Sequence, residues 1–396
     1  MSMSRKTYWA VPVIVAVAIG GFVAYSGQAS AEPPLPALTA QQLIANVASA
    51  QTPAFSGNLS VTTDIGLPDL SSLQNLFGSQ MNIGGLTSLL AGTTNVKVAV
   101  DPATGARAEI DSGTSAYVAV ANLANDDGWV YLSASNSATH LTGLAGASSG
   151  EDGESPAQTV PTPQNIADQL INVMSPSTTI SVADNTTVAG RPAYTLDLTP
   201  KDSGSLISAV DIMIDANSWM PLGVRIWSTQ LAGQAALDVS FTALSYATPS
   251  ASLFNFTAPA DATVQTVDLG QDAAGQSRGD SSDDTAPAPS ATTVAGEGWA
   301  SVTELTNLPA SITSALDDPA QLAGLLTGAA NGTGGGHGNH GSLNTMDQLI
   351  GSIAQQTPQG MVYSTYLGSL LVTPSGHVFV GAVPASALEA AAQANQ

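Results

Sequence analysis

The sequence predicts a mainly β protein of the α+β class. We expect a half-open, curved antiparallel β-barrel of about eleven strands with a helical lid, followed by a small C-terminal α+β domain. Three observations predict it, namely short segments in which apolar and polar residues alternate, turn residues between them, and only two amphipathic helices before residue 258. Alternation with a period of two puts successive side chains on opposite faces of a sheet, so one face is apolar and something must cover it.

The stretch 191–246 alternates most regularly. Its four segments contain the residues 194–198, 210–214, 220–226 and 237–241, and short breaks at 201–204, 217–218 and 231–233 separate them. Breaks of this length usually join antiparallel neighbours, so the stretch predicts a four-stranded meander.

Two helices and seven further strands are expected before this meander. Thr39 with Gln42 three residues later has the capping-box pattern of a helix start, and Pro163 opens a second helix that Pro176 stops. Strands are predicted at 55–65, 95–100, 106–111, 116–121, 128–133, near 139 and at 178–188. The simplest arrangement lays both helices over the concave face of the curved sheet.

The segment 66–92 interrupts the strand pattern and contains many large apolar residues among Gly and Ser. One interpretation is a packed surface loop with its own small core. The other is a mobile apolar flap beside a binding mouth, where Met and Gly permit repacking.

Residues 1–31 have the pattern of an export signal. Arg5 and Lys6 precede an almost wholly apolar run at 8–25, and Ala29-Ser30-Ala31 provides an A-x-A cleavage site. Because the run is nearly long enough to cross a bilayer, an uncleaved anchor is the alternative. Either way we expect an extracytoplasmic protein, secreted or anchored to the outer face of the cytoplasmic membrane by residues 8–25.

The rest of the chain divides into three parts by composition. We assign residues 38–258 to the half-barrel domain and residues 297–392 to the small α+β domain. Between them, 270–296 is rich in Asp, Ser, Ala, Pro and Gly, which predicts an acidic disordered linker.

The charge balance excludes several partners. The chain has 8 Lys and Arg against 30 Asp and Glu, a formal net charge of −22. Nucleic acids and anionic lipid headgroups need a basic surface, so we expect no nucleic-acid partner. The chain has no Cys, which rules out disulfides and thiol chemistry. We expect a monomer.

No arrangement of residues predicts catalysis. The sequence lacks the motifs of serine hydrolases, zinc proteases and nucleotide-binding loops. His337 and His340 lie in a Gly-rich segment without Cys or a nearby carboxylate, so a solvated loop is favoured over a metal site. We therefore expect no catalytic residue, no metal and no cofactor.

Several motifs give the chain a family resemblance. They are Leu38-Thr39-Ala40-Gln41-Gln42-Leu43-Ile44, Phe55-Ser56-Gly57-Asn58-Leu59, Gly128-Trp129-Val130-Tyr131, Val188-Ala189-Gly190-Arg191-Pro192-Ala193-Tyr194 and Asp215-Ala216-Asn217-Ser218-Trp219-Met220-Pro221-Leu222. The combination resembles the actinobacterial relatives of the LolA lipoprotein carrier, in the superfamily that also contains the RseB/MucB sensors. The resemblance implies a half-barrel lidded by helices, whose apolar cavity receives acyl chains. The 66–92 insertion, the acidic linker and the C-terminal domain depart from a simple carrier and favour an anchored envelope module.

Three functions follow as hypotheses. The first is non-enzymatic binding of the acyl chains of a lipid or lipoprotein; the second is an RseB-like envelope sensor that binds a membrane anti-sigma partner; the third, an enzyme, is disfavoured. The residues expected to line the cavity are Leu59, Val61, Val98, Val130, Tyr194, Leu196, Ile212, Met220, Leu222, Val224, Leu237 and Val239. Those expected in the lid or flap are Leu43, Ile44, Val47, Phe77, Met81, Ile166 and Leu170. Arg191 is the candidate for a polar head group, and ordinary core packing is the alternative for each lining residue.

Overall fold

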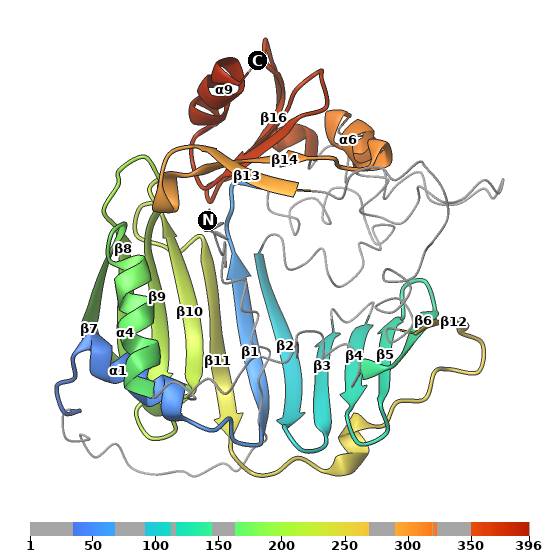
Figure 1. Ribbon diagram of the computed structural model, residues 1–396. Coiled ribbons are helices and arrows are strands. Elements are labelled where there is room, and N and C mark those ends of the chain that lie inside the picture. The colour runs from blue at the N-terminus through green and yellow to red at the C-terminus, as the bar shows by residue number, and fades with distance from the viewer. Residues whose placement is uncertain are drawn as a thin grey trace, which may run out of the picture.

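The described residues form two β-sheets, and the smaller sheet lies beyond one end of the strands of the larger sheet (Figure 1). The computed structural model describes residues 35–67, 92–111, 116–144, 163–268, 290–318, 320–322 and 350–395. The large sheet contains β1 (Phe55–Thr63), β2 (Gly92–Asp101), β3 (Gly105–Asp111), β4 (Ala116–Asn122), β5 (Asp127–Leu132), β6 (Ser137–Thr142), β7 (Thr178–Val188), β8 (Arg191–Pro200), β9 (Ile207–Asp215), β10 (Pro221–Ser228), β11 (Leu237–Ser245) and β12 (Thr263–Asp268).

The large sheet is curved and open. Its strand order is β12-β6-β5-β4-β3-β2-β1-β11-β10-β9-β8-β7, so β1 joins one antiparallel meander, β2–β6, to another, β7–β11. Among the described residues its two edges, β7 and β12, do not pair with each other. The predicted fold class is confirmed, with one addition, because β12 pairs in parallel with β6 as a twelfth strand.

One face of the large sheet carries an aliphatic row, and we call this the inner face. Six strands contribute successive cross-strand partners to the row, which are Val182, Leu196, Ile212, Val224, Val239 and Val61. Cross-strand partners point to the same side of a sheet, so the alternation in the sequence becomes one continuous apolar surface.

The next row, on the opposite or outer face, is polar. It runs through Ser181, Asp197, Asp211, Arg225, Asp238 and Thr62. Arg225 Nε donates to Asp238 Oδ2 at 2.8 Å, and Trp227 Nε1 donates to Asp211 at 2.7 Å. Burial is the largest influence on the pKa of Asp211, which lies above its ordinary value. The sheet is therefore amphipathic across these six strands.

Helices α1 (Ala40–Ser49) and α4 (Pro163–Met174) cover one end of the inner face. Thr39 and Gln42 form the predicted capping box, with Gln42 N donating to Thr39 Oγ1 at 3.2 Å and Thr39 N donating to Gln42 Oε1 at 2.9 Å. In α1, Leu43 is fully buried in a cluster with Tyr194 and Leu196. The helices thus cover the β7–β9 end of the face (Figure 1).

The C-terminal unit is a second antiparallel sheet in the order β13-β14-β18-β17-β16-β15. Its elements are β13 (Ser290–Ala295), β14 (Val302–Thr306), α6 (Ala310–Asp317), β15 (Ala354–Thr357), β16 (Gly360–Ser364), β17 (Ser369–Val372), β18 (Val378–Gly381) and α9 (Ala385–Ala394). Leu388 of α9 packs against Leu371 and Phe379 in the core of this unit.

The structure corrects one boundary of the predicted linker. Residues 290–295, which the sequence assigns to the disordered segment 270–296, form β13 and pair with β14. Ser, Ala and Thr fill this strand and make it resemble a linker in composition, but it gains its hydrogen bonds from β14, 302–306. The rest of that segment up to residue 289, the signal or anchor 1–31, Phe77, Met81, His337 and His340 lie outside the described residues.

The turn between β7 and β8 gives a prediction for stability. Ala189 and Gly190 form a two-residue hairpin loop with φ of 50° and 73°, both in the left-handed region. A β-carbon at Gly190 would meet no atom within 4 Å, so Gly190→Ala should cost only backbone strain, about 1 kcal/mol of unfolding free energy.

Gly351 offers the matched control in a urea unfolding experiment. It is helical, lacks a positive φ, and its added β-carbon would also meet no atom within 4 Å. Gly351→Ala should therefore be neutral or stabilising. Equal losses in the two variants would contradict the assigned turn.

Candidate ligand-binding face

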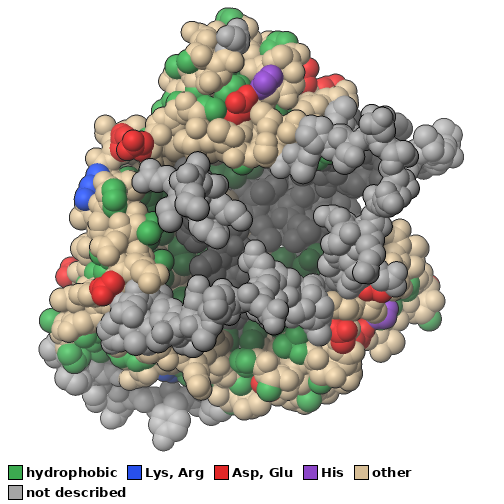
Figure 2. All heavy atoms as spheres, in the orientation of Figure 1, with side chains coloured by type: hydrophobic (Ala, Val, Ile, Leu, Met, Phe, Trp, Pro, Cys, Tyr) green, Lys and Arg blue, Asp and Glu red, His purple; other side chains and the backbone are tan. Residues whose placement is uncertain are grey.

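The middle of the inner face is apolar and only half covered. Leu196, the second residue of the aliphatic row, is 6% exposed, whereas the four aliphatic residues that follow it across the sheet are all of intermediate exposure. These four are Ile212, Val224, Val239 and Val61. Figure 2 shows hydrophobic side chains gathered on this side of the molecule.

Small side chains line the inner face over β3–β5. Val100 of β2 is followed across the sheet by Ala106, Ala121 and Gly128. In the next inner row, Val98 is followed by Ala108, Ala119 and Val130. The alanines fill less volume than Val or Leu would. At Gly128, however, an added β-carbon would meet Leu141 Cβ at 3.2 Å and Leu144 Cδ1 at 3.3 Å, so leucine side chains fill that end of the region.

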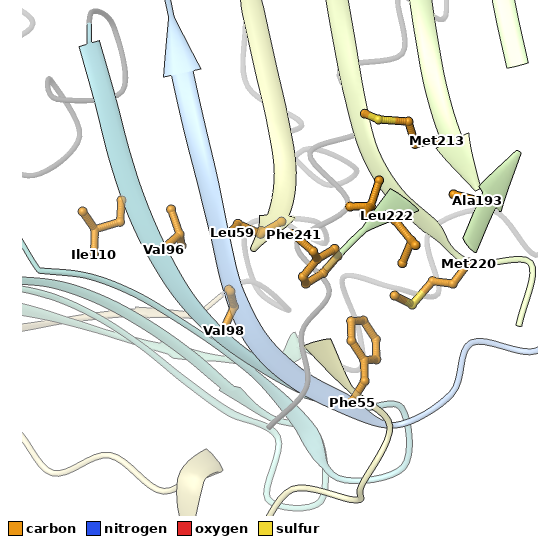
Figure 3. Close-up of a cluster of buried hydrophobic side chains, with 11 residues drawn as sticks. Phe55, Leu59, Val96, Val98, Ile110, Ala193, Met213, Met220, Leu222 and Phe241 are labelled. Atoms are coloured by element: carbon orange, nitrogen blue, oxygen red, sulfur yellow. The ribbon is translucent and has the colours of Figure 1, made fainter. Parts of the chain in front are cut away.

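Ten of the twelve predicted lining residues share the inner face by strand register. They are Leu59, Val61, Val98, Val130, Tyr194, Leu196, Ile212, Val224, Leu237 and Val239. Leu222 is different because it lies at a β-bulge and is 0% exposed, packed in the core with Phe55 and Phe241 (Figure 3). Met220 lies in the turn before β10 and is 6% exposed in the same core. Leu59 and Val98 are buried in this same core, and Tyr194 and Leu196 are buried in the Leu43 cluster. Six of the twelve predicted lining residues are therefore packed as core, and the other six are half-buried.

The predicted lid residues have separate positions. Leu43, Ile44 and Val47 of α1 pack on the β8–β9 end of the inner face. Leu170 of α4 is 46% exposed, so it does not close over the inner face as the sequence pattern predicted. The reason is the packing of α4 on α1, which buries Ala167 fully and leaves Leu170 exposed. The side chain of Ile166 lies outside the described residues.

An aromatic pair closes the covered end of the inner face. Tyr194 stacks on Trp219 with ring centroids 5.9 Å apart, and its hydroxyl donates to Pro36 O at 3.0 Å. Trp219 has a φ of 60°, which is uncommon for a bulky residue. Trp219 N donates to Asp215 O at 3.0 Å, so the turn from 215 holds this conformation.

An ionic network around the buried Asp215 stabilises the same turn, residues 215–219. Asp215 is 0% exposed and accepts hydrogen bonds from Arg191 Nε, from the backbone N–H of Asn217 at 2.7 Å and of Ser218 at 3.1 Å, and from the Tyr246 hydroxyl at 3.0 Å. The Arg191 guanidinium also lies 4.6 Å from the centre of the Tyr246 ring.

Burial alone would raise the pKa of Asp215, but the hydrogen bonds from Arg191, Asn217 and Ser218 outweigh it and lower that pKa. Burial also raises the pKa of Tyr246 to about 12. Asp215 is therefore a structural anion.

Sequence reasoning missed this network, although its signal was present. Arg191 lies in the resemblance motif 188–194 and Asp215 in the motif 215–222. Their ion pair gives a physical reason for these two motifs to occur together. Arg191 is the first residue of β8, and its guanidinium is paired with Asp215. Its contact with a ligand's head group remains a prediction.

The outer face offers a different chemistry. A shallow groove there is lined by Asn58, Asn95, Lys97, Glu109, Asp111 and Thr242. Lys97 Nζ lies 3.9 Å from Glu109 Oε1. Further along, His140 stacks on Trp129 at 4.3 Å and contacts Asp127. These polar groups do not suit an acyl chain, which leaves the inner face as the candidate site.

Comparisons with solved structures give neighbours of similar architecture. A MucB structure in complex with MucA, from Pseudomonas aeruginosa, is 15% identical, with 89% of this chain and 96% of that chain covered and a TM-score of 0.36. A LolA superfamily protein from Nitrosomonas europaea is 12% identical, with 56% and 99% covered and a TM-score of 0.21. LolA superfamily and MucB proteins are thus both among its structural neighbours.

A third neighbour is an uncharacterised conserved protein from Thermus thermophilus. It is 12% identical, with 58% of this chain and 99% of that chain covered and a TM-score of 0.32. No protein-family model and no curated protein matches the chain.

Within the described ranges, no group of three or more His, Cys, Asp or Glu side chains is arranged to hold a metal ion. Nor does any helix in that part of the chain have the length and apolar character to cross a membrane.

Proposed function

We propose that the inner face binds the acyl chains of a lipid or lipoprotein outside the cytoplasm, without catalysing a reaction. One observation carries the proposal: the aliphatic row stays half-covered through Ile212, Val224, Val239 and Val61, beside a region of the same face built from Ala and Gly. A soluble protein normally covers such a surface, so a removable apolar occupant explains it best.

The hydrophobic effect provides enough free energy for this occupant. Each CH₂ group removed from water contributes about 0.8 kcal/mol, so a 16-carbon chain offers on the order of 10 kcal/mol before the costs of association. The row needs no charged side chain, because non-directional burial of methylene groups supplies the affinity. Specificity would then depend mainly on chain length and shape.

Native mass spectrometry of the protein purified from its host tests the proposal. We expect adducts whose masses identify a diacyl or triacyl species, and displacement of these adducts by an added fatty acid. A clean apo mass, together with no uptake of a fluorescent fatty acid, would contradict acyl binding.

A second candidate is an envelope sensor that binds a membrane partner protein. Backbone hydrogen bonds connect the C-terminal unit to the ends of strands of the large sheet, with Tyr366 N donating to Ile65 O at 2.9 Å and Leu206 N donating to Ala382 O at 2.7 Å. Such contacts allow an occupant of the inner face to change what the C-terminal unit presents. Ligand-dependent recovery of an anti-sigma factor in a pull-down would favour a sensor over a carrier.

A further inference from the structure

Helix α4 exposes two large aliphatic side chains. Val173 is 78% exposed, more than any other large hydrophobic side chain in the described part of the protein, and Leu170 is 46% exposed. Residues three apart are neighbours on a helix surface, so the two side chains form one exposed apolar patch. The patch lies along one flank of α4, next to the buried Ala167, and polar residues occupy the rest of the exposed side. Ala167 of α4 is fully buried and Met174 packs against the cluster around Leu43 of α1. The side of α4 that carries these two residues is therefore packed on the rest of the protein.

The layer formed by α1 and α4 is nearly free of charge. Helix α1 has no charged residue, and the only one in α4 is Asp168, which accepts a hydrogen bond from Gln41 of α1. Beyond the end of α4, Lys201 Nζ donates to Ser175 O at 2.5 Å. Apolar side chains bordered by uncharged amides can enter the interface of a zwitterionic bilayer without burying a charge.

The chain itself brings this layer close to a bilayer. The described chain begins at Leu35, which packs in the same cluster as Leu43 of α1 and Met174 of α4. The apolar run 8–25 ends ten residues earlier. Ten residues reach at most about 36 Å, and a helix of the length of α4 spans only about 18 Å. If residues 8–25 enter a bilayer, its surface is therefore within reach of α4.

We propose that the exposed apolar patch of α4, Leu170 and Val173, rests on the surface of the bilayer that residues 8–25 enter. This contact holds the helix-covered end of the inner face at the lipid–water boundary. It adds a fixed orientation to the molecule and does not depend on acyl binding. The occupant is a lipid surface; a second copy of the chain is the competing occupant that the experiment must separate.

Site-directed spin labelling tests the proposal cleanly because the chain has no Cys. The full chain would be reconstituted into phosphatidylcholine vesicles with a nitroxide at Val173→Cys or Leu170→Cys. We expect the ratio of collisions with oxygen to collisions with a water-soluble nickel chelate to be several-fold higher than for an exposed control. Leu123→Cys, 53% exposed in the turn before β5, and Ile312→Cys, 37% exposed in α6, are matched controls.

Three outcomes would overturn the proposal. They are equal collision ratios at 173 and 123, a full chain that does not associate with the vesicles, and dipolar broadening between labels at 173, which would show a second copy against α4. The double variant Leu170→Gln with Val173→Gln should keep its uptake of fluorescent fatty acid, which separates this proposal from the acyl-binding function.

Discussion

Replacing Asp215 with Ala should lower the free energy of unfolding by about 3 kcal/mol, because it removes a fully buried carboxylate from an Arg191 side chain that is itself 27% exposed. The Arg191 guanidinium would lose the carboxylate that neutralises it, and the backbone N–H groups of Asn217 and Ser218 would lose their acceptor. The turn that holds Trp219 against Tyr194 would loosen with them. Urea denaturation followed by tryptophan fluorescence measures the loss.

Asp238→Ala is the matched control, because it removes an ion pair in which both side chains stay partly exposed. Arg225 and Asp238 are paired at 2.8 Å with side chains 35% and 29% exposed, and such pairs contribute about 0–1 kcal/mol. Losses of equal size in the two variants would show that burial does not set the strength of the Asp215 network.

The pH dependence of the Asp215 contribution has a definite sign. Its folded-state pKa is lowered, so the unfolded chain takes up a proton first as the pH falls. The contribution is therefore complete above the ordinary value of 3.8 and is lost as the pH drops below it through the folded value. The stability difference between the wild type and Asp215→Asn should stay constant at neutral pH and shrink only in strong acid.

Val224→Asp should weaken the uptake of a fluorescent fatty acid by about 100-fold or more, equivalent to about 2.7 kcal/mol. Val224 lies between Ile212 and Val239 in the aliphatic row. In the empty protein, the new carboxylate reaches water because this position is only half-buried. An acyl chain bound on the row would displace the water that solvates this carboxylate. Burying an unpaired carboxylate is unfavourable, so binding would be weaker.

Ser60→Asp introduces the same charge on the outer face of the sheet. Ser60 precedes Val61 in β1, and its cross-strand partners are Ser240 and Asn95, so no apolar row is interrupted. Its fatty-acid uptake should stay within about twofold of the wild type, a difference of only about 0.4 kcal/mol. Circular dichroism of both variants would establish that they fold. Normal uptake by Val224→Asp would remove the aliphatic row from the binding site.

The sequence by itself determined the eleven strands between residues 55 and 246, the inner and outer sides of most of them, and where α1 and α4 begin. Period-two alternation in 191–246 gives the correct side for Leu196, Ile212 and Val224 because the pleat of a strand enforces it locally. The start of α1 was equally readable, because its capping box involves only Thr39 and Gln42.

Only the tertiary structure decided features that join distant parts of the chain. Three such features depend on contacts between segments far apart in sequence. They are the pairing of β12 with β6, the burial of Asp215 beside Arg191, and the exposure of Leu170. Local periodicity reports which side of an element is apolar, but the neighbour that packs there is set by the global arrangement. For this reason the sequence identified an apolar sheet face, and the structure showed which of its described residues are buried and which are only half-buried.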